Sequence, residues 1–180
     1  FGQIDSLDRR RDPVQSESGQ FLEILDTGQR SNRTQRRITL GSIAIDYTAT
    51  PAPMSLARCL LEHGFRVTRI YADSIAADDQ EDFRWLQENF GDTELWPTKA
   101  PALRLLPRPS HPAGPPVLAL GQKAAFFQNT PHFVNMVEGG GRWGFSAIEA
   151  LASDMVAAYR ERQDIEENVR RKGLGGPSLL

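Results

Sequence analysis

The sequence predicts an α/β, Rossmann-like domain with a mainly parallel sheet of four or five strands, helices on both faces and a long C-terminal helix. Short runs of β-branched and apolar residues alternate with segments whose apolar residues recur at helical spacing. The first strand, helix and strand together occupy about 35 residues, the length of a βαβ unit, whose crossover is right-handed. This alternation favours a parallel sheet over an all-α or all-β fold.

The first half of the domain supplies three expected strands and two helices. The strands are expected at residues 37–47, 65–71 and 93–96. The first helix spans residues 54–63, and Gly64 ends it because glycine readily adopts the left-handed C-cap conformation. The second helix spans residues 78–90, where the carboxylates of Asp78 and Asp79 suit the positive N-terminal end.

The second half begins with a proline-rich segment, residues 97–116, which is expected to be mostly loop. A short strand, a helix and a final strand are expected at residues 117–120, 122–128 and 132–137. The last helix begins near residue 144 and carries an apolar stripe at helical spacing, formed by Ile148, Leu151, Ala152, Met155, Val156 and Tyr159. The polar residues beyond the stripe leave open whether this helix continues to residue 172.

The flanks differ in character from the domain, which we place at residues 36–172. Residues 1–35 are expected to be a linker or the end of a preceding domain, with one short amphipathic helix at residues 18–25, and residues 173–180 a flexible tail. The first residues offer neither an initiator Met nor a signal-peptide pattern. We therefore expect the chain to be a segment of a larger protein.

Composition excludes several classes of function. The 180 residues carry a net charge of -2, so no basic field attracts nucleic acid. A single cysteine, Cys59, rules out an intrachain disulfide, and its mid-helix position favours an inert thiol over a cluster ligand. No apolar run approaches the roughly 20 residues that span a membrane, and a cytoplasmic location is expected.

Two groups of residues are candidates for ligand contact. The first βα turn, residues 46–51, has no glycine, so the usual dinucleotide phosphate loop is not predicted. Gly121, Gln122 and Lys123 open a helix directly after a strand, where backbone N–H groups and the ammonium can face an anion. The second group lies on a loop before the long helix: Glu138, Gly139, Gly140, Gly141 and Arg142. Alternatively, Lys123 is merely exposed, and Glu138 pairs with Arg142 or lines an interface.

Several short motifs follow one another in a fixed order. They are Gly121-Gln122-Lys123, Pro131-His132-Phe133 through Met136, Gly139 to Gly141, Gly144-Phe145 and Asp154-Met155. In this order, and with the upstream βαβ unit, they resemble the C-terminal Rossmann-like domain of the nitrogenase component 1 oxidoreductases. That family includes nitrogenase, cofactor-assembly scaffolds and tetrapyrrole reductases, and the resemblance covers about residues 37–172.

The resemblance implies a multidomain protein that holds an iron–sulfur cluster, a related metallocluster or a tetrapyrrole at a junction of domains. It also implies a paralogous component 1 subunit and an ATP-dependent iron protein as electron donor, with cluster cysteines supplied by missing N-terminal domains. Lys123 matches a lysine near the cofactor cavity. Val137 stands where catalytic nitrogenase has a metal-ligating histidine, so no metal ligand and no catalytic residue is assigned.

Three functions remain open. In the first, the domain forms one wall of a cluster or substrate cavity in a nitrogenase-like reductase, and positions and electrostatically stabilises a bound anion. In the second, the parent protein is a non-catalytic scaffold for metallocluster assembly. In the third, the domain binds a phosphate or nucleotide at residues 121–123, since a fold does not fix a function. The segment alone is expected to be inactive.

Overall fold

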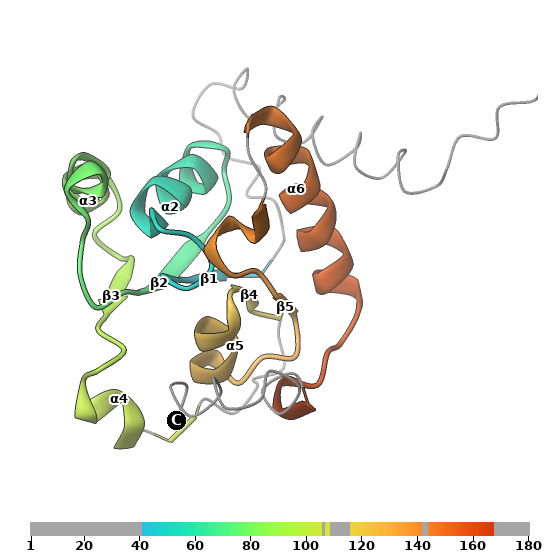
Figure 1. The fold of residues 1–180 in the computed structure, drawn as a ribbon. Helices are drawn as coiled ribbons and strands as arrows, with labels where there is room; N and C mark the ends of the chain where they lie inside the picture. Colours follow the sequence, from blue (N-terminus) through green and yellow to red (C-terminus); the bar gives the residue numbers. More distant parts are fainter. Residues whose placement is uncertain (1–40, 106, 109–115, 142–143, 168–180) are drawn as a thin grey trace, which may run out of the picture.

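Five short strands form one parallel sheet, which confirms the predicted Rossmann-like α/β class (Figure 1). The structure is a computed structural model that describes residues 41–105, 107–108, 116–141 and 144–167. The strands are β1 (Ile43–Asp46), β2 (Val67–Tyr71), β3 (Glu94–Trp96), β4 (Leu118–Leu120) and β5 (Phe133–Val134). The linker, helix and tail expected at residues 1–35 and 173–180 lie outside the described residues.

The order of the strands in the sheet is β3-β2-β1-β4-β5. The chain therefore builds outward from β1 in one direction, and then returns to add β4 on the other side of β1. The gap between β1 and β4 is the switch point at which open parallel sheets form their ligand crevice. All four residues of β1 are buried, because this central strand is covered on both faces.

Helices cover both faces of the sheet, as predicted (Figure 1). They are α2 (Pro53–Glu62), α3 (Gln80–Asn89), α4 (Pro101–Leu105), α5 (Gln122–Gln128) and α6 (Gly144–Arg160). Side chains alternate between the two cores: Ile43 and Ile45 of β1 pack in the core shared with α2, α3 and α6. Between them, Ala44 faces Ala124 and Ala125 of α5 in the second core.

Two details go beyond the sequence-based expectations. The segment 97–116 was expected to be mostly loop, but residues 101–105 form α4, because proline is tolerated in the first turn and Ala and Leu favour the helix. The last helix ends at Arg160 and does not reach residue 172. The chain turns back there because Gln163 binds the edge of the sheet through its backbone N–H to Pro131 and its side chain to Phe133.

The remaining differences are small. Strand β5 covers only residues 133–134 of the expected 132–137, and β1 begins at Ile43. Gly64 has a φ of 86° and ends α2 as predicted. In α6 the buried stripe begins at Ala152, whereas Ile148 is 49% exposed, because the first turns of the helix extend past the sheet. Within the described residues, no helix is long and apolar enough to cross a membrane.

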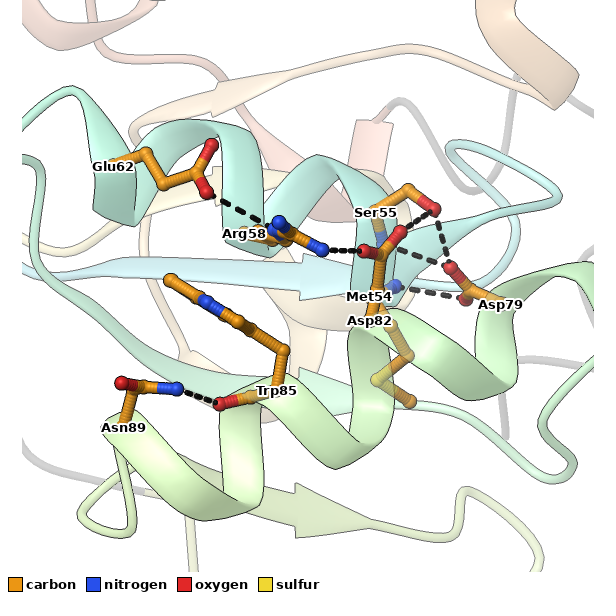
Figure 2. Close-up of polar contacts among 8 residues, drawn as sticks. All are labelled: Met54, Ser55, Arg58, Glu62, Asp79, Asp82, Trp85 and Asn89. Carbon is orange, nitrogen blue, oxygen red and sulfur yellow. Dashed lines mark hydrogen bonds and ion pairs between the residues drawn. The ribbon is translucent and has the colours of Figure 1, made fainter.

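The N-terminus of α2 is capped from far along the chain (Figure 2). Asp79 is fully buried, and its carboxylate accepts hydrogen bonds from the backbone N–H groups of Met54 at 2.9 Å and Ser55 at 2.7 Å. The sequence predicted that Asp79 would serve the helix it precedes, α3, but its side chain makes no capping bond there. Since α2 has no side-chain cap of its own, the carboxylate satisfies that helix instead.

Candidate functional site

The carboxyl ends of the strands place polar side chains around the switch point. Asp46 ends β1 and is followed by Tyr47, while Gly121 and Lys123 follow β4. Asp73 lies beyond the end of β2 on the same edge of the sheet. Because parallel strands end together, residues from distant parts of the sequence meet here.

Asp46 is the most enclosed of these groups, with no exposed surface. Its Oδ1 accepts hydrogen bonds from the backbone N–H groups of Thr48 at 2.7 Å and Ala49 at 3.2 Å, and from the Thr48 hydroxyl. Its Oδ2 accepts from the backbone N–H of Ala124 at 2.8 Å, in the first turn of α5. Burial raises the pKa of this carboxyl, and the hydrogen bonds, led by that of Thr48, only partly oppose the rise.

Gly121 is required by the same contact. It has a φ of 102°, a conformation that side-chain-bearing residues rarely adopt, and a Cβ at this position would lie 2.3 Å from Asp46 Oδ2. Because Gly121 has no side chain, the Asp46 carboxylate can lie against its Cα and reach the Ala124 N–H of α5.

The Asp46 carboxylate occupies one backbone donor at the start of α5. It accepts from the Ala124 N–H, directly after the residues 121–123 that were predicted to face an anion. A phosphate approaching this helix end would have to displace a buried carboxylate or lie beside its negative charge. Of the backbone donors predicted at residues 121–123, the Gly121 N–H is bonded to the Val134 carbonyl at 3.1 Å.

Lys123 differs, because its charge is not balanced locally. Its side chain belongs to a residue only 7% exposed, and Nζ donates a hydrogen bond to Tyr47 Oη at 2.6 Å. Among the described residues, the ion pairs are Arg58–Glu62, Arg58–Asp82 and Arg69–Glu94, and none includes Lys123. An ammonium removed from water with one neutral acceptor is energetically unfavourable unless another acceptor is supplied.

The Lys123 charge helps to lower the pKa of Asp73, although the two side chains form no ion pair. Burial raises the pKa of the Asp73 carboxyl, but hydrogen bonds from the Thr98 hydroxyl and the Lys99 backbone N–H, together with the charges of Lys99 and Lys123, bring it below its usual value. Those two hydrogen bonds, at 2.8 and 2.9 Å, hold the carboxylate toward the end of β3. Asp73 is therefore a distant counter-charge for the ammonium.

Gln122 and the glycine-bearing segment complete the edge. Gln122, 5% exposed, donates from Nε2 to Asn135 Oδ1 at 2.7 Å, which ties α5 to the residue after β5. The backbone N–H groups of Glu138 and Gly139 donate to the carbonyls of Thr48 and Ala49 at 2.8 and 2.7 Å. The turn after β1 is thus bonded to α5 on one side and to the glycine segment on the other.

The glycine segment, residues 138–141, has a left-handed backbone throughout. Glu138, Gly139, Gly140 and Gly141 all have positive φ, between 48° and 75°. Arg142 lies outside the described residues, so its pairing with Glu138, its place at an interface and its contact with a ligand all stay predictions. Glu138 and Gly140 are exposed beside the turn, on the carboxyl edge of the sheet.

Metal-ligating side chains do not converge in the part of the chain that the structure describes. No three His, Cys, Asp or Glu residues there are placed to hold a metal ion. Cys59 lies on the exposed side of α2, with Sγ 4.0 Å from His63 Nδ1, and Val137 is 42% exposed and brings no donor atom.

Two residues of this edge were not singled out from the sequence. Asp46 and Tyr47 were considered only as part of a turn without glycine. An aspartate at the end of a fully apolar strand was the available signal, since a buried carboxylate needs several donors. The Tyr47–Lys123 contact joins residues 76 positions apart, and no local sequence pattern predicts it.

Comparison with known proteins does not extend this description. No protein-family model, curated protein or solved structure matches the chain.

Proposed function

We propose that this domain forms one wall of an anion-holding cavity in a nitrogenase component 1-type oxidoreductase. The bound metallocluster or substrate would lie against the carboxyl edge of the sheet, next to Lys123. The ordered motifs from Gly121 to Met155 and the resemblance they carry support the family. The parallel sheet with its switch point between β1 and β4 supports the location of the cavity.

One observation carries the proposal, namely the buried ammonium of Lys123 without a carboxylate partner. In the described residues its hydrogen bond goes to the Tyr47 hydroxyl, and Asp73 feels its charge without forming an ion pair with it. Proteins rarely bury a lysine unless the charge is paired. A negatively charged ligand, held between this domain and the rest of the parent protein, would supply the missing pair.

The role of this chain is positioning and electrostatic stabilisation. A metallocluster, when bound, supplies the redox chemistry of such an enzyme, and its ligands would come from outside the described residues. Lys123 would hold positive charge against the bound anion in a site closed to water, where such a charge acts strongly. By the resemblance, the partners are the missing N-terminal domains, a paralogous component 1 subunit and an ATP-dependent iron protein, all in the cytoplasm.

A cofactor-assembly scaffold is the second candidate, and Val137 favours it. This side chain, 42% exposed directly after Met136, offers no metal donor where a catalytic nitrogenase has a histidine. A scaffold would bind a cluster precursor and release it to an acceptor without turnover. The third candidate, a phosphate or nucleotide site at residues 121–123, is weakened because Asp46 already occupies the start of α5.

The experiment that tests the family proposal is anaerobic purification of the full-length protein that carries this chain. We expect stoichiometric iron, together with the ultraviolet–visible absorption and electron paramagnetic resonance signal of a cluster. A colourless, iron-free protein under reducing conditions would contradict the proposal. In that case a retained nucleotide or phosphate would move the third candidate forward.

Enzyme and scaffold are then separated by what happens to the cluster. Electron transfer from the iron protein, with ATP consumed and the cluster retained, supports a reductase. Release of the cluster to an apo-acceptor without ATP-dependent turnover supports a scaffold.

A further inference from the structure

Tyr47 stands at the centre of the switch point. It follows Asp46 in the turn after β1, is half-buried, and its ring packs partly against the core under α2. The Lys123 ammonium lies 2.6 Å from Tyr47 Oη and 4.6 Å from the ring centroid. The hydroxyl end of the ring is therefore the part of Tyr47 that meets the ammonium.

The direction of this hydrogen bond follows from chemistry. An ammonium has donors and no acceptor, so the phenol oxygen must accept from Lys123. The single hydroxyl proton of Tyr47 is then left for another acceptor. No hydrogen bond among the described residues takes it, and Lys123 likewise uses one of its three N–H donors there.

We infer that Tyr47 is a positioning residue that holds the Lys123 ammonium at the switch point, and that the two side chains act as one unit of paired donors. Such a unit matches an anion with at least two acceptor atoms, one for the ammonium and one for the hydroxyl proton. A single-atom anion satisfies only one of them. The ligand class rests on the proposed function, whereas the positioning of Lys123 by Tyr47 does not.

The chain offers a matched control in Tyr71. This residue is buried in β2, and its hydroxyl accepts a hydrogen bond from Gln128 Nε2 at 2.6 Å. Tyr71→Phe therefore removes the same group from the same sheet without touching Lys123. Tyr47→Phe keeps the ring and its packing and removes only the oxygen.

The test measures how fast the Lys123 amine reacts in the full chain. The protein is treated with sulfosuccinimidyl acetate, and acetylation of Lys123 and of the exposed Lys99 is followed by mass spectrometry. Amide hydrogen exchange in β1 and β4 checks that each variant remains folded. We expect Lys123 to react about tenfold faster in Tyr47→Phe, because the lost bond is one to a charged group. Lys99 should be unchanged, as should Lys123 in Tyr71→Phe.

Equal rates for Lys123 in the wild type and in folded Tyr47→Phe would overturn the positioning role, as burial alone would then hold the ammonium. A second arm compares sulfate with chloride at equal ionic strength. Sulfate should slow acetylation of Lys123 more than chloride does, and this difference should vanish in Tyr47→Phe. Equal protection by both anions would overturn the ligand class. An iron-free parent protein would instead contradict only the proposed function, because neither arm depends on iron.

Discussion

Two buried aspartates, Asp79 and Asp46, each accept hydrogen bonds from backbone N–H groups at the start of a helix, but their surroundings differ. Asp79 caps α2 and Asp46 binds the start of α5, and each carboxylate comes from outside the helix that it serves. Both are fully buried and accept backbone N–H groups, which those helix ends cannot satisfy themselves. Their surroundings differ in whether the neighbouring cation has a carboxylate partner among the described residues.

Around Asp79 the neighbouring cation, Arg58, is paired with two carboxylates (Figure 2). Ser55 donates from its hydroxyl to Asp79 and contacts Asp82, and Arg58 binds Asp82 at 2.8 Å and Glu62 at 3.0 Å. The Arg58 guanidinium also lies 4.9 Å from the centroid of Trp85. This network ties α2 to α3, and its cation is paired within the chain.

Around Asp46 the neighbouring cation is Lys123. The Asp46 carboxylate accepts from Thr48, Ala49 and Ala124, and no ion pair joins it to Lys123 among the described residues. In both places the buried carboxylate serves the structure, because it binds backbone N–H groups at the start of a helix. The functional candidate is the cation beside Asp46, whose charge the described residues do not balance.

The largest expected effect comes from breaking the approach of β4 to Asp46. Gly121→Ala places a methyl group against the carboxylate and forces a positive φ, and should lower the free energy of unfolding by roughly 2–5 kcal/mol. Chemical denaturation measures it, with Gly91→Ala as the control, because a Cβ there meets only ordinary contact at 4.0 Å. A Gly121→Ala protein as stable as wild type would mean that Asp46 is not held against α5.

Asp46→Asn tests the hydrogen bonds themselves. Each carboxylate oxygen accepts from a backbone N–H, so the amide nitrogen must face a donor, and we expect a loss of about 1–3 kcal/mol. Asp79→Asn should cost a similar amount for the same reason, whereas the exposed Asp78→Asn should be neutral. If Asp46→Asn unfolds at the same denaturant concentration as wild type, the two caps are not equivalent.

Replacing Lys123, in contrast, should make the fold more stable. Lys123→Met keeps the apolar stem and removes the buried charge, and should raise the free energy of unfolding by about 1 kcal/mol. Lys99→Met, at an exposed position on the same edge, should change it little. A loss of several kcal/mol in Lys123→Met would show instead that the ammonium is a structural group.

The smallest expected effect is a change in the pH dependence of stability at the contact between α2 and α3. The Ser55 hydroxyl, and then Arg58, lower the pKa of Asp82, so its ionised form stabilises the fold above the usual carboxyl pKa. That stabilisation is lost as pH falls through the lowered pKa. In Ser55→Ala the pKa of Asp82 is lowered less, so unfolding measured from pH 6 to pH 2 should show a shallower acid-induced loss of stability. Ser74→Ala, at an exposed position, should keep the wild-type slope.

The sequence predicted the parts of this molecule that depend on local periodicity. The helix at residues 122–128 and the strand at 93–96 were placed within one residue, and the all-parallel sheet followed from the alternation of elements. Lys123 was expected after the fourth strand, and it lies there, at the carboxyl edge of the sheet. Its position follows from the strand that precedes it, which local pattern can locate.

The rest depended on contacts between distant residues. Asp79 appeared to serve its own helix, but accepts from Met54 and Ser55, which are 25 and 24 positions earlier. Tyr47 could not be singled out from the sequence, because its hydrogen bond is with Lys123, 76 residues away. Helix α4 was obscured by prolines, whose effect on a helix depends on whether they stand in its first turn.

The most direct test of the role of Lys123 is the cluster spectrum of the full-length protein in two lysine variants. Electron paramagnetic resonance of Lys123→Met and Lys99→Met, purified anaerobically, is compared with wild type at equal iron content. An altered signal or lost iron in Lys123→Met alone is expected if the ammonium faces the bound anion. Three identical spectra with equal iron would contradict that placement and return Lys123 to a structural role.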